Sequence, residues 1–477
     1  MGSAGGACRF DSTTSARNPC PMQPVFSRPG RLQSCLPAML LMLGFGGRDP
    51  LCPPLSAASE PSLIASSEPG WAQWRGPRRD GICDETGLRQ AWAEGGPPRL
   101  WTSEDLGRGY SAPIVAGGRI FLTGDFEERL ELLTLDLNGQ LLWRATNGLA
   151  WRREYPGARS SCTLREGRLY HKNAHGRVAC FDPATGRELW AVDTLARFEG
   201  KNTTWGLSES VLVEDGRVFI TAGGAKALMV ALDARTGAVV WTSEPLLLGA
   251  PKTAAHERIA TPAGEAEGAG YTSPILARLA GHRQIINCSL RHVFGVDADT
   301  GRLLWSRPFP TRYAVIAATP VLVADAVLVT APDAGGGRLF RIAADGAGGL
   351  SVSQVWRTDL DSGQGGVLLR EDVLYGSWYR ARKGWAAVAA TSGEVRHEIP
   401  DLATGPLLYA DQRLYWLSQE GEMTLVKPGA KTCEIVSRFR LVPGRVNDAW
   451  AHPVIQDGRL YLRYHERLHC FDVRAAE

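Results

Sequence analysis

Aromatic, cationic and imidazole side chains precede a series of short predicted β-hairpins in this chain. Gathered on a concave surface, such side chains suit an acidic or aromatic ligand, because the cations attract an acid and the rings offer flat apolar faces. They also have a purely structural use, since they can fill a channel mouth and satisfy loop backbone groups. The candidate ligand-binding residues are Arg108, Tyr110, Arg159, Trp205, Glu209, Tyr271, Gln364 and His452.

The carboxylates and histidines of the sequence give little support for a metal-binding site. Glu209 is the one carboxylate among the candidates, and nothing in the sequence brings the loop aspartates Asp333, Asp361 and Asp448 together. Two histidine pairs have the i, i+4 spacing that binds zinc on a helix, but both fall on predicted hairpins: His171 with His175, and His465 with His469. We therefore predict no metal site and name no catalytic residue.

The hairpins alternate with a recurring phrase, Asp-x-x-Thr-Gly-x-x-x-Trp. It is complete at residues 182–190, 233–241 and 297–305, and it is one residue shorter at 136–143. Asp and Gly suit a tight turn, because Asp hydrogen-bonds its own backbone and Gly accepts a positive φ. Recurrence every 40 to 60 residues or so indicates one supersecondary unit used many times.

Each unit reads as four antiparallel strands, and eight units can be counted. Asp-Gly or Gly-Gly pairs between apolar runs predict the opening hairpins. Six closing strands end in Trp, and His397 and Phe439 take that place in two more. The first closing strand, at Leu100-Trp101, has no hairpin before it, and the last hairpin has no closing strand after it. We therefore predict an all-β fold, an eight-bladed β-propeller of four-stranded antiparallel blades in which an N-terminal strand completes the last blade.

Composition bounds the possible partners. The chain has 477 residues and a formal net charge of +3, which argues against general nucleic-acid binding. The six cysteines after residue 70 follow no disulfide or zinc spacing. We expect a monomer.

The first 58 residues are predicted to be a leader. Arg28 and Arg31 precede an apolar run over residues 36–45, and small residues follow at 56–59. This order is typical of a secretory signal peptide, and the run is too short to span a membrane comfortably. The expected organisation is a signal peptide or leader over 1–58, with Met22 as an alternative start, a linker over 59–70 and the propeller over 71–477. The expected location is periplasmic or secreted.

The recurring phrases resemble the tryptophan-docking repeats of the pyrroloquinoline-quinone (PQQ) propeller superfamily, over about residues 71–477. The segment from Trp71 to Gly81 and the closing Trp450-Ala-His-Pro453 are similar to a subgroup of PQQ-like repeat proteins secreted by bacteria. The superfamily includes quinoprotein dehydrogenases, which hold PQQ with Ca²⁺, and non-catalytic BamB-like propellers of outer-membrane assembly. The resemblance implies that each Trp docks between neighbouring blades, so the phrase is architectural.

Two departures favour the BamB-like branch. The chain has neither a Cys-Cys pair nor a Cys-x-x-Cys-His haem motif, features expected of the dehydrogenase branch. We therefore expect a binding or scaffold module with a protein partner in the cell envelope and no cofactor. The alternatives are a PQQ- or metal-dependent oxidoreductase, which would use PQQ with Ca²⁺, and a propeller that binds a small ligand or a glycan.

Overall fold

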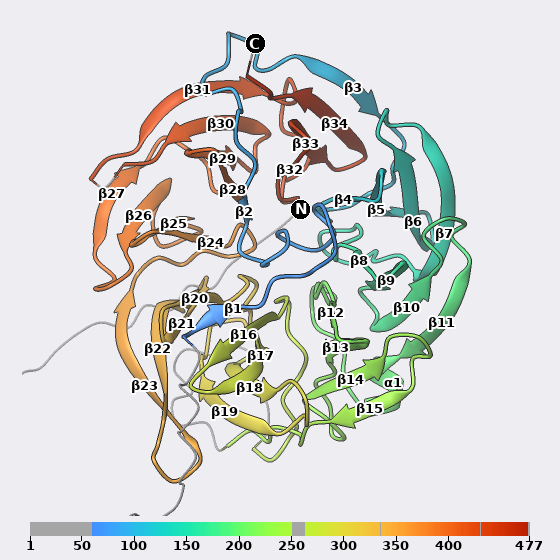
Figure 1. The fold of residues 1–477 in the computed structure, drawn as a ribbon, viewed down its shortest axis with the longest axis vertical. Helices are drawn as coiled ribbons and strands as arrows, with labels where there is room; N and C mark the ends of the chain where they lie inside the picture. The colour runs from blue at the N-terminus through green and yellow to red at the C-terminus, as the bar shows by residue number, and fades with distance from the viewer. Residues whose placement is uncertain (1–59, 250–262, 334, 430, 476–477) are drawn as a thin grey trace, which may run out of the picture. The chain divides into compact units, whose positions relative to one another are not determined.

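The computed structural model describes residues 60–249, 263–333, 335–429 and 431–475, and the leader predicted over 1–58 lies outside them. The described chain is almost entirely β, with one short helix, α1 (Thr194–Phe198). Eight blades of four antiparallel strands are arranged in a ring, and two of the blades gain a fifth strand from the N-terminal segment (Figure 1). The predicted eight-bladed β-propeller is thus confirmed.

The blades follow one another in chain order, and in seven of them the innermost strand comes first. Blade 1 holds β4 (Ile114–Ala116), β5 (Arg119–Phe126), β6 (Arg129–Asp136) and β7 (Leu141–Leu149); blade 2 holds β8 (Thr163–Arg165), β9 (Arg168–Lys172), β10 (Arg177–Phe181) and β11 (Glu188–Asp193). Blade 3 holds β12 (Leu212–Glu214), β13 (Arg217–Thr221), β14 (Met229–Asp233) and β15 (Val239–Thr242); blade 4 holds β16 (Ile275–Leu279), β17 (His282–Cys288), β18 (His292–Asp297) and β19 (Leu303–Pro308).

The second half of the ring repeats this order. Blade 5 holds β20 (Val321–Val323), β21 (Ala326–Ala331), β22 (Gly336–Ala344) and β23 (Leu350–Thr358); blade 6 holds β24 (Val367–Arg370), β25 (Val373–Ser377), β26 (Trp385–Ala389) and β27 (Val395–Ile399). Blade 7 holds β28 (Leu407–Ala410), β29 (Arg413–Leu417), β30 (Glu422–Lys427) and β31 (Glu434–Arg440). Blade 8 holds β32 (Val454–Gln456), β33 (Arg459–Tyr464), β34 (Arg467–Asp472) and β3 (Arg99–Ser103), so the N-terminal strand closes the ring as predicted.

The segment before β3 crosses the centre of the ring (Figure 1). We call residues 62–85 the central segment. Its strand β1 (Ser62–Leu63) pairs antiparallel with β16, and β2 (Ile82–Cys83) pairs in parallel with β28. Between these strands the central segment reaches blades 1, 2, 3, 5 and 6, and Cys83 and Glu85 reach blade 8. Part of the stretch predicted as a linker, 59–70, therefore belongs to a sheet.

Tryptophan docking joins neighbouring blades at the outer rim. In five seams the indole N–H of the outer-strand Trp donates to a main-chain carbonyl in the turn of the next blade, at 3.0–3.2 Å. The ring lies against the turn glycine so closely that a methyl group added there would come within 2.5–2.7 Å of it. These five tryptophans are Trp101, Trp143, Trp190, Trp241 and Trp356.

Three seams use other contacts. Trp305 turns its N–H to Gln284 Oε1 in its own blade, at 2.7 Å. Phe439 is buried and packs on Gly96, a residue of the stretch leading into β3. Where His397 takes the Trp place, Trp385 of blade 6 stacks on Trp416 of blade 7, with centroids 4.2 Å apart and an interplanar angle of 9°. The two seams without a closing Trp are therefore well packed by substitutes.

Buried polar side chains join the blades nearer the centre. They occupy one repeated place, near the end of the second strand of a blade. Thr123 donates to Ser160 O of blade 2, Lys172 to Thr221 O of blade 3, and Thr330 to Ser362 O of blade 6, at 3.0–3.2 Å. Arg463 of blade 8 donates to Thr123 O of blade 1 at 2.6 Å. Because these groups are desolvated, each needs its partner across the seam.

No helix within the described ranges is long and apolar enough to cross a membrane. The six described cysteines are free thiols. Cys180 and Cys470 are fully buried on central strands, as their repeat position predicted.

Two glycine substitutions test the outer seam. Gly186 and Gly167 both have positive φ, at +74° and +69°, but a methyl group at Gly186 would sit 2.5 Å from the Trp143 ring, whereas one at Gly167 meets no atom within 4 Å. We expect Gly186→Ala to cost about 1–3 kcal/mol more than Gly167→Ala, because only the former overpacks a seam. Thermal and urea unfolding of the two variants measure the difference, and equal losses would contradict the docking account.

Candidate functional site

A cavity of about 320 Å³ opens at the centre of one face of the ring, among the loops that enter the inner strands. We call this cavity the funnel. Its wall is rich in aromatic side chains, with two arginines, Arg159 and Arg380, and one aspartate, Asp333. The aromatic residues are Trp74, Tyr110, Tyr155, Trp205, Tyr271, Tyr313, Tyr379 and Trp450.

Five of the eight candidate residues line the funnel: Tyr110, Arg159, Trp205, Tyr271 and Gln364. The structure thus brings them together, and their role in ligand binding stays a prediction. Four further rings were not among the predicted candidates: Trp74, Tyr155, Tyr313 and Tyr379. The three tyrosines lie in irregular loops and carry no repeat signal, whereas Trp74 belongs to the phrase from Trp71 to Gly81. Trp450 also belongs to a phrase that the sequence analysis singled out, the closing Trp-Ala-His-Pro.

The remaining three candidates lie outside the funnel. Arg108 is 60% exposed, lies 3.7 Å from Glu466 as an ion pair, and lines a neighbouring cavity. Glu209 is 1% exposed and His452 is 3% exposed, so both are packed inside the protein.

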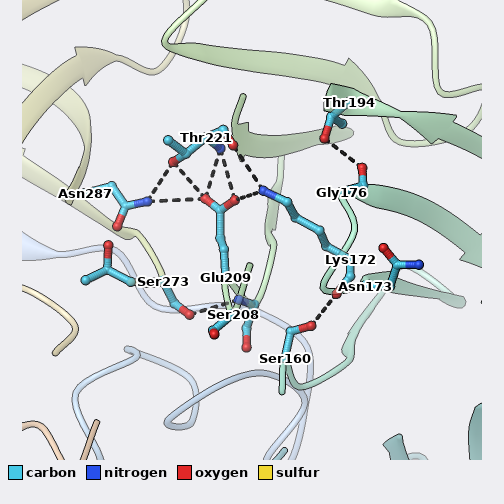
Figure 2. Close-up of polar contacts among 12 residues, drawn as sticks. Ser160, Lys172, Asn173, Gly176, Thr194, Ser208, Glu209, Thr221, Ser273 and Asn287 are labelled. Carbon is cyan, nitrogen blue, oxygen red and sulfur yellow. Dashed lines mark hydrogen bonds and ion pairs between the residues drawn. The ribbon is translucent and has the colours of Figure 1, made fainter. Parts of the chain in front are cut away.

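Glu209 belongs to a buried ion pair at the junction of blades 2, 3 and 4 (Figure 2). Its carboxylate accepts from Lys172 Nζ at 2.6 Å, from the backbone N–H and hydroxyl of Thr221 at 2.9–3.1 Å, and from Asn287 Nδ2 at 3.2 Å. Lys172 is also 1% exposed. Since both charges are satisfied and enclosed, the pair serves to hold the blades together rather than to meet a ligand.

The base of the funnel is built by the central segment. Trp74 donates its indole N–H to Thr319 Oγ1 at 3.0 Å, and its ring meets His452 edge-on at 4.5 Å. His452 Nε2 donates to Gln364 O at 3.0 Å. Burial, and then the nearby charge of Arg75, lower the pKa of His452 to about 3, so its imidazole stays neutral.

The wall groups its rings around Trp450. Tyr110 and Tyr155 lie with their centroids 5.0 and 5.1 Å from that of Trp450, and Trp205 lies 6.2 Å from Tyr271 on another part of the wall. Burial raises the pKa of Tyr110 and of Tyr271, so both phenols are neutral hydrogen-bonding groups at physiological pH.

Three aspartates of the funnel loops are already engaged. Asp333 pairs with Arg380 at 2.8 Å. Asp361 accepts three backbone N–H groups at 2.8–2.9 Å, and Asp448 pairs with Arg445. Within the described part of the chain, no three His, Cys, Asp or Glu side chains gather as a metal site would require. A hard cation such as Ca²⁺ needs several free oxygens, so these residues do not fit a PQQ–Ca²⁺ pair.

The ring nitrogens of the two histidine pairs are mostly bound within the protein. His171 contacts Asn147 and Ser160, His175 donates to Ala150 O, and His469 contacts Thr102. These contacts are structural.

The geometry defines an eight-bladed propeller with tryptophan-docked blades and a central aromatic funnel to which the central segment contributes Trp74. The family model described as "Outer membrane protein assembly factor BamB" matches residues 131–399, more than half of the chain. The chain therefore belongs to this family of PQQ-like repeat propellers.

Individual relatives fall on both branches of the superfamily. The chain is 31% identical over 146 residues to the quinohemoprotein alcohol dehydrogenase ADH-IIG of Pseudomonas putida, covering 29% of this chain and 20% of that protein. It is 28% identical over 165 residues to BamB of Kangiella koreensis, covering 34% of this chain and 39% of that protein. Because the matches span well under half of these relatives, they do not transfer an activity.

Solved structures agree on the fold. BamB from Moraxella catarrhalis aligns with a TM-score of 0.50 at 13% identity, over 80% of this chain and 98% of that one. Quinohemoprotein alcohol dehydrogenase from Comamonas testosteroni aligns with a TM-score of 0.57 at 14% identity, over 86% and 81% of the two chains. At these identities the likeness concerns architecture alone.

Asp125 predicts a pH dependence of stability. It lines the cavity of about 590 Å³ beside the funnel, accepts the Trp151 N–H at 2.9 Å through Oδ2, and leaves Oδ1 buried without a hydrogen-bond partner. Burial raises the pKa of Asp125 from 3.8 to about 7. The folded state therefore binds this proton more tightly than the unfolded state, so the contribution of Asp125 is most favourable below pH 4 and is lost as pH rises towards 7.

Asp125→Asn removes this titration while keeping an oxygen for Trp151. The free energy of unfolding of the variant relative to the native chain should rise between pH 4 and 7, by up to about 4 kcal/mol for a shift of this size. Urea unfolding at a series of pH values measures it. A difference that stays constant with pH would show that Asp125 ionises normally.

Proposed function

We propose that this chain is a binding module of the cell envelope whose funnel holds a segment of a partner protein, and that it does no chemistry of its own. The observation that carries the proposal is the composition of the funnel wall. Three Trp, five Tyr and two Arg side chains line it. Trp, Tyr and Arg are the residue types that carry most binding energy where proteins meet.

The state of the charged groups supports binding over catalysis. A quinone-type alcohol oxidation needs a base for the alcohol proton and a site for a hard cation. The aspartate of the funnel wall is paired with Arg380, and Glu209 is enclosed with Lys172. What the funnel offers a ligand is rings, phenol hydroxyls and two cations.

The location in the envelope rests on two observations. The family carries the name of an outer-membrane assembly factor, and the order of basic, apolar and small residues in the first 58 positions is that of a secretory signal peptide. In its more specific form, the proposal is that the bound partner takes part in assembly of the cell envelope.

The alternative is an oxidoreductase, which the partial match to an alcohol dehydrogenase favours. Purified full chain, titrated with PQQ and Ca²⁺, should show no tight binding and no alcohol- or sugar-dependent dye reduction. Saturable PQQ binding with turnover would overturn the proposal.

Site-specific photo-crosslinking in cells tests the binding role itself. A crosslinker replacing Tyr379 in the funnel wall should give a discrete protein adduct, whereas one replacing Val355, which is 40% exposed on the outer strand β23, should not. Adding Trp450→Ala to the chain that carries the crosslinker at position 379 should remove the adduct, because the Trp450 ring anchors the wall. An adduct only at Val355, or one insensitive to Trp450, would place the partner elsewhere.

A further inference from the structure

The central segment crosses the centre of the ring and supplies Trp74 to the funnel lining, so a polypeptide that enters the funnel meets this segment instead of an open channel (Figure 1). Trp74 lines the base and is held by Thr319 and His452. Its neighbours in the central segment, Trp71 and Arg75, are each only 3% exposed and do not line the funnel. A segment entering the funnel must therefore turn back or end there. A volume of about 320 Å³ lies at the low end of the range for small-ligand sites, so it favours an end over a turn.

One positive charge of the funnel wall, that of Arg159, has no carboxylate within ion-pair distance among the described residues, although it interacts at longer range with Asp125. Arg380 pairs with Asp333, but Arg159 forms no ion pair in the described ranges. Its guanidinium donates to main-chain oxygens only, from Nη1 to Gly157 O at 3.5 Å and from Nη2 to Glu154 O and Tyr155 O at 3.2 and 2.8 Å, and its Nε has no hydrogen-bond partner. Burial lowers the pKa of Arg159 to about 10, so the guanidinium remains charged at neutral pH. A ligand carboxylate would offset this partly desolvated charge.

Arg159 lies among the rings of the wall. Its charge interacts with Tyr110, Asp125 and Tyr271, and its guanidinium lies 5.3 Å from the centroid of the Trp151 ring. Tyr110 belongs to the group around Trp450, which also includes Tyr155. A ligand whose carboxylate reaches Arg159 therefore brings the atoms next to that carboxylate against an aromatic surface, where a ring gains most from packing.

We propose that the funnel captures the carboxy-terminal end of its partner protein, with the terminal carboxylate on Arg159 and an aromatic last side chain against Trp450. This inference rests on the proposed function and names the partner's chemistry. A chain end meets the three conditions at once: it stops inside the funnel, carries a negative charge and presents a ring beside that charge. Gln364 and Ser208 line the same funnel and supply hydrogen bonds for the main chain behind the last residue.

Peptide binding to the full chain tests the proposal. The probe is a fluorescent Gly-Ser peptide ending in tryptophan, made with a free carboxylate and as the carboxamide, and measured by anisotropy. The free acid should bind about 10-fold or more tightly than the amide, because a charge-assisted hydrogen bond is lost in the amide. Equal affinities, or no binding of the free acid, overturn the proposal.

Variants separate recognition of the charge from support of the loop. Arg159→Gln should abolish the preference for the free acid while changing the amide's affinity by no more than about twofold, and Arg159→Lys should keep part of the preference. Arg312→Gln is the matched control, since Arg312 is exposed and lies over Tyr313 without lining the funnel. A purely structural role for Arg159 would instead weaken both peptides equally.

Competitors identify other ligands. A peptide with its tryptophan and an aspartate placed internally, N-acetyltryptophan, and a uronic-acid oligosaccharide should each bind more weakly than the carboxy-terminal peptide. Displacement at equal or lower concentration by any of them overturns the chain-end assignment. A crosslinked partner at Tyr379 without discrimination between free acid and amide would leave the proposed function standing and remove only this inference.

Discussion

The structure depends on one interaction above the others, the pairing of the central segment with the inner edges of the blades. An inner strand in the ring has no neighbour on its channel side, so its main-chain groups need partners. Residues 62–85 supply them by strand pairing at β16 and β28 and by side chains elsewhere. Arg75 donates to Val367 O and Arg79 donates to Ser210 O and Val211 O, all in the interior. Burial lowers the pKa of Arg75 to about 10 and that of Arg79 to about 9, and both remain cations.

This arrangement places the central segment across the channel of the ring (Figure 1). Outer-rim docking of Trp on Gly fixes the spacing of most blades, and buried polar side chains such as Lys172 and Arg463 join them nearer the centre. The loops that enter the inner strands then converge on a base made by Trp74. Because the acidic groups nearby are used to hold loops, the funnel presents rings and cations. That balance suits recognition of an anionic aromatic group better than electron transfer through a metal-bound quinone.

The sequence predicted the architecture because its signals are periodic. A Trp that stacks on a turn glycine needs that glycine in every copy of the phrase. The regular spacing of Gly and Trp therefore predicts the blades and their docking. The contacts that replace Trp docking at two seams could not be predicted, because they do not recur in the sequence. In one of them Phe439 packs on Gly96, and in the other Trp385 stacks on Trp416.

The site was predicted only in part, because a loop residue can face the cavity or the wall. Ser208 lines the funnel, whereas its neighbour Glu209 is enclosed by Lys172 and Thr221. Nothing in the local sequence decides between these directions, since the charged partner, Lys172, lies 37 residues away in another blade. The central segment was missed for a related reason. Most of its contacts are single hydrogen bonds to separate blades, and they leave no periodic pattern.

Hydrogen exchange of the central segment tests its place in the channel most directly, since a funnel that ends on Trp74 requires this segment to stay there. We expect the backbone amides of residues 71–83 that donate within the structure, such as those of Trp71, Gly76 and Gly81, to exchange as slowly as those of the inner strands they touch. Exchange within seconds under native conditions, with the blade strands still protected, would show that the channel is open and would contradict a channel occupied by residues 62–85.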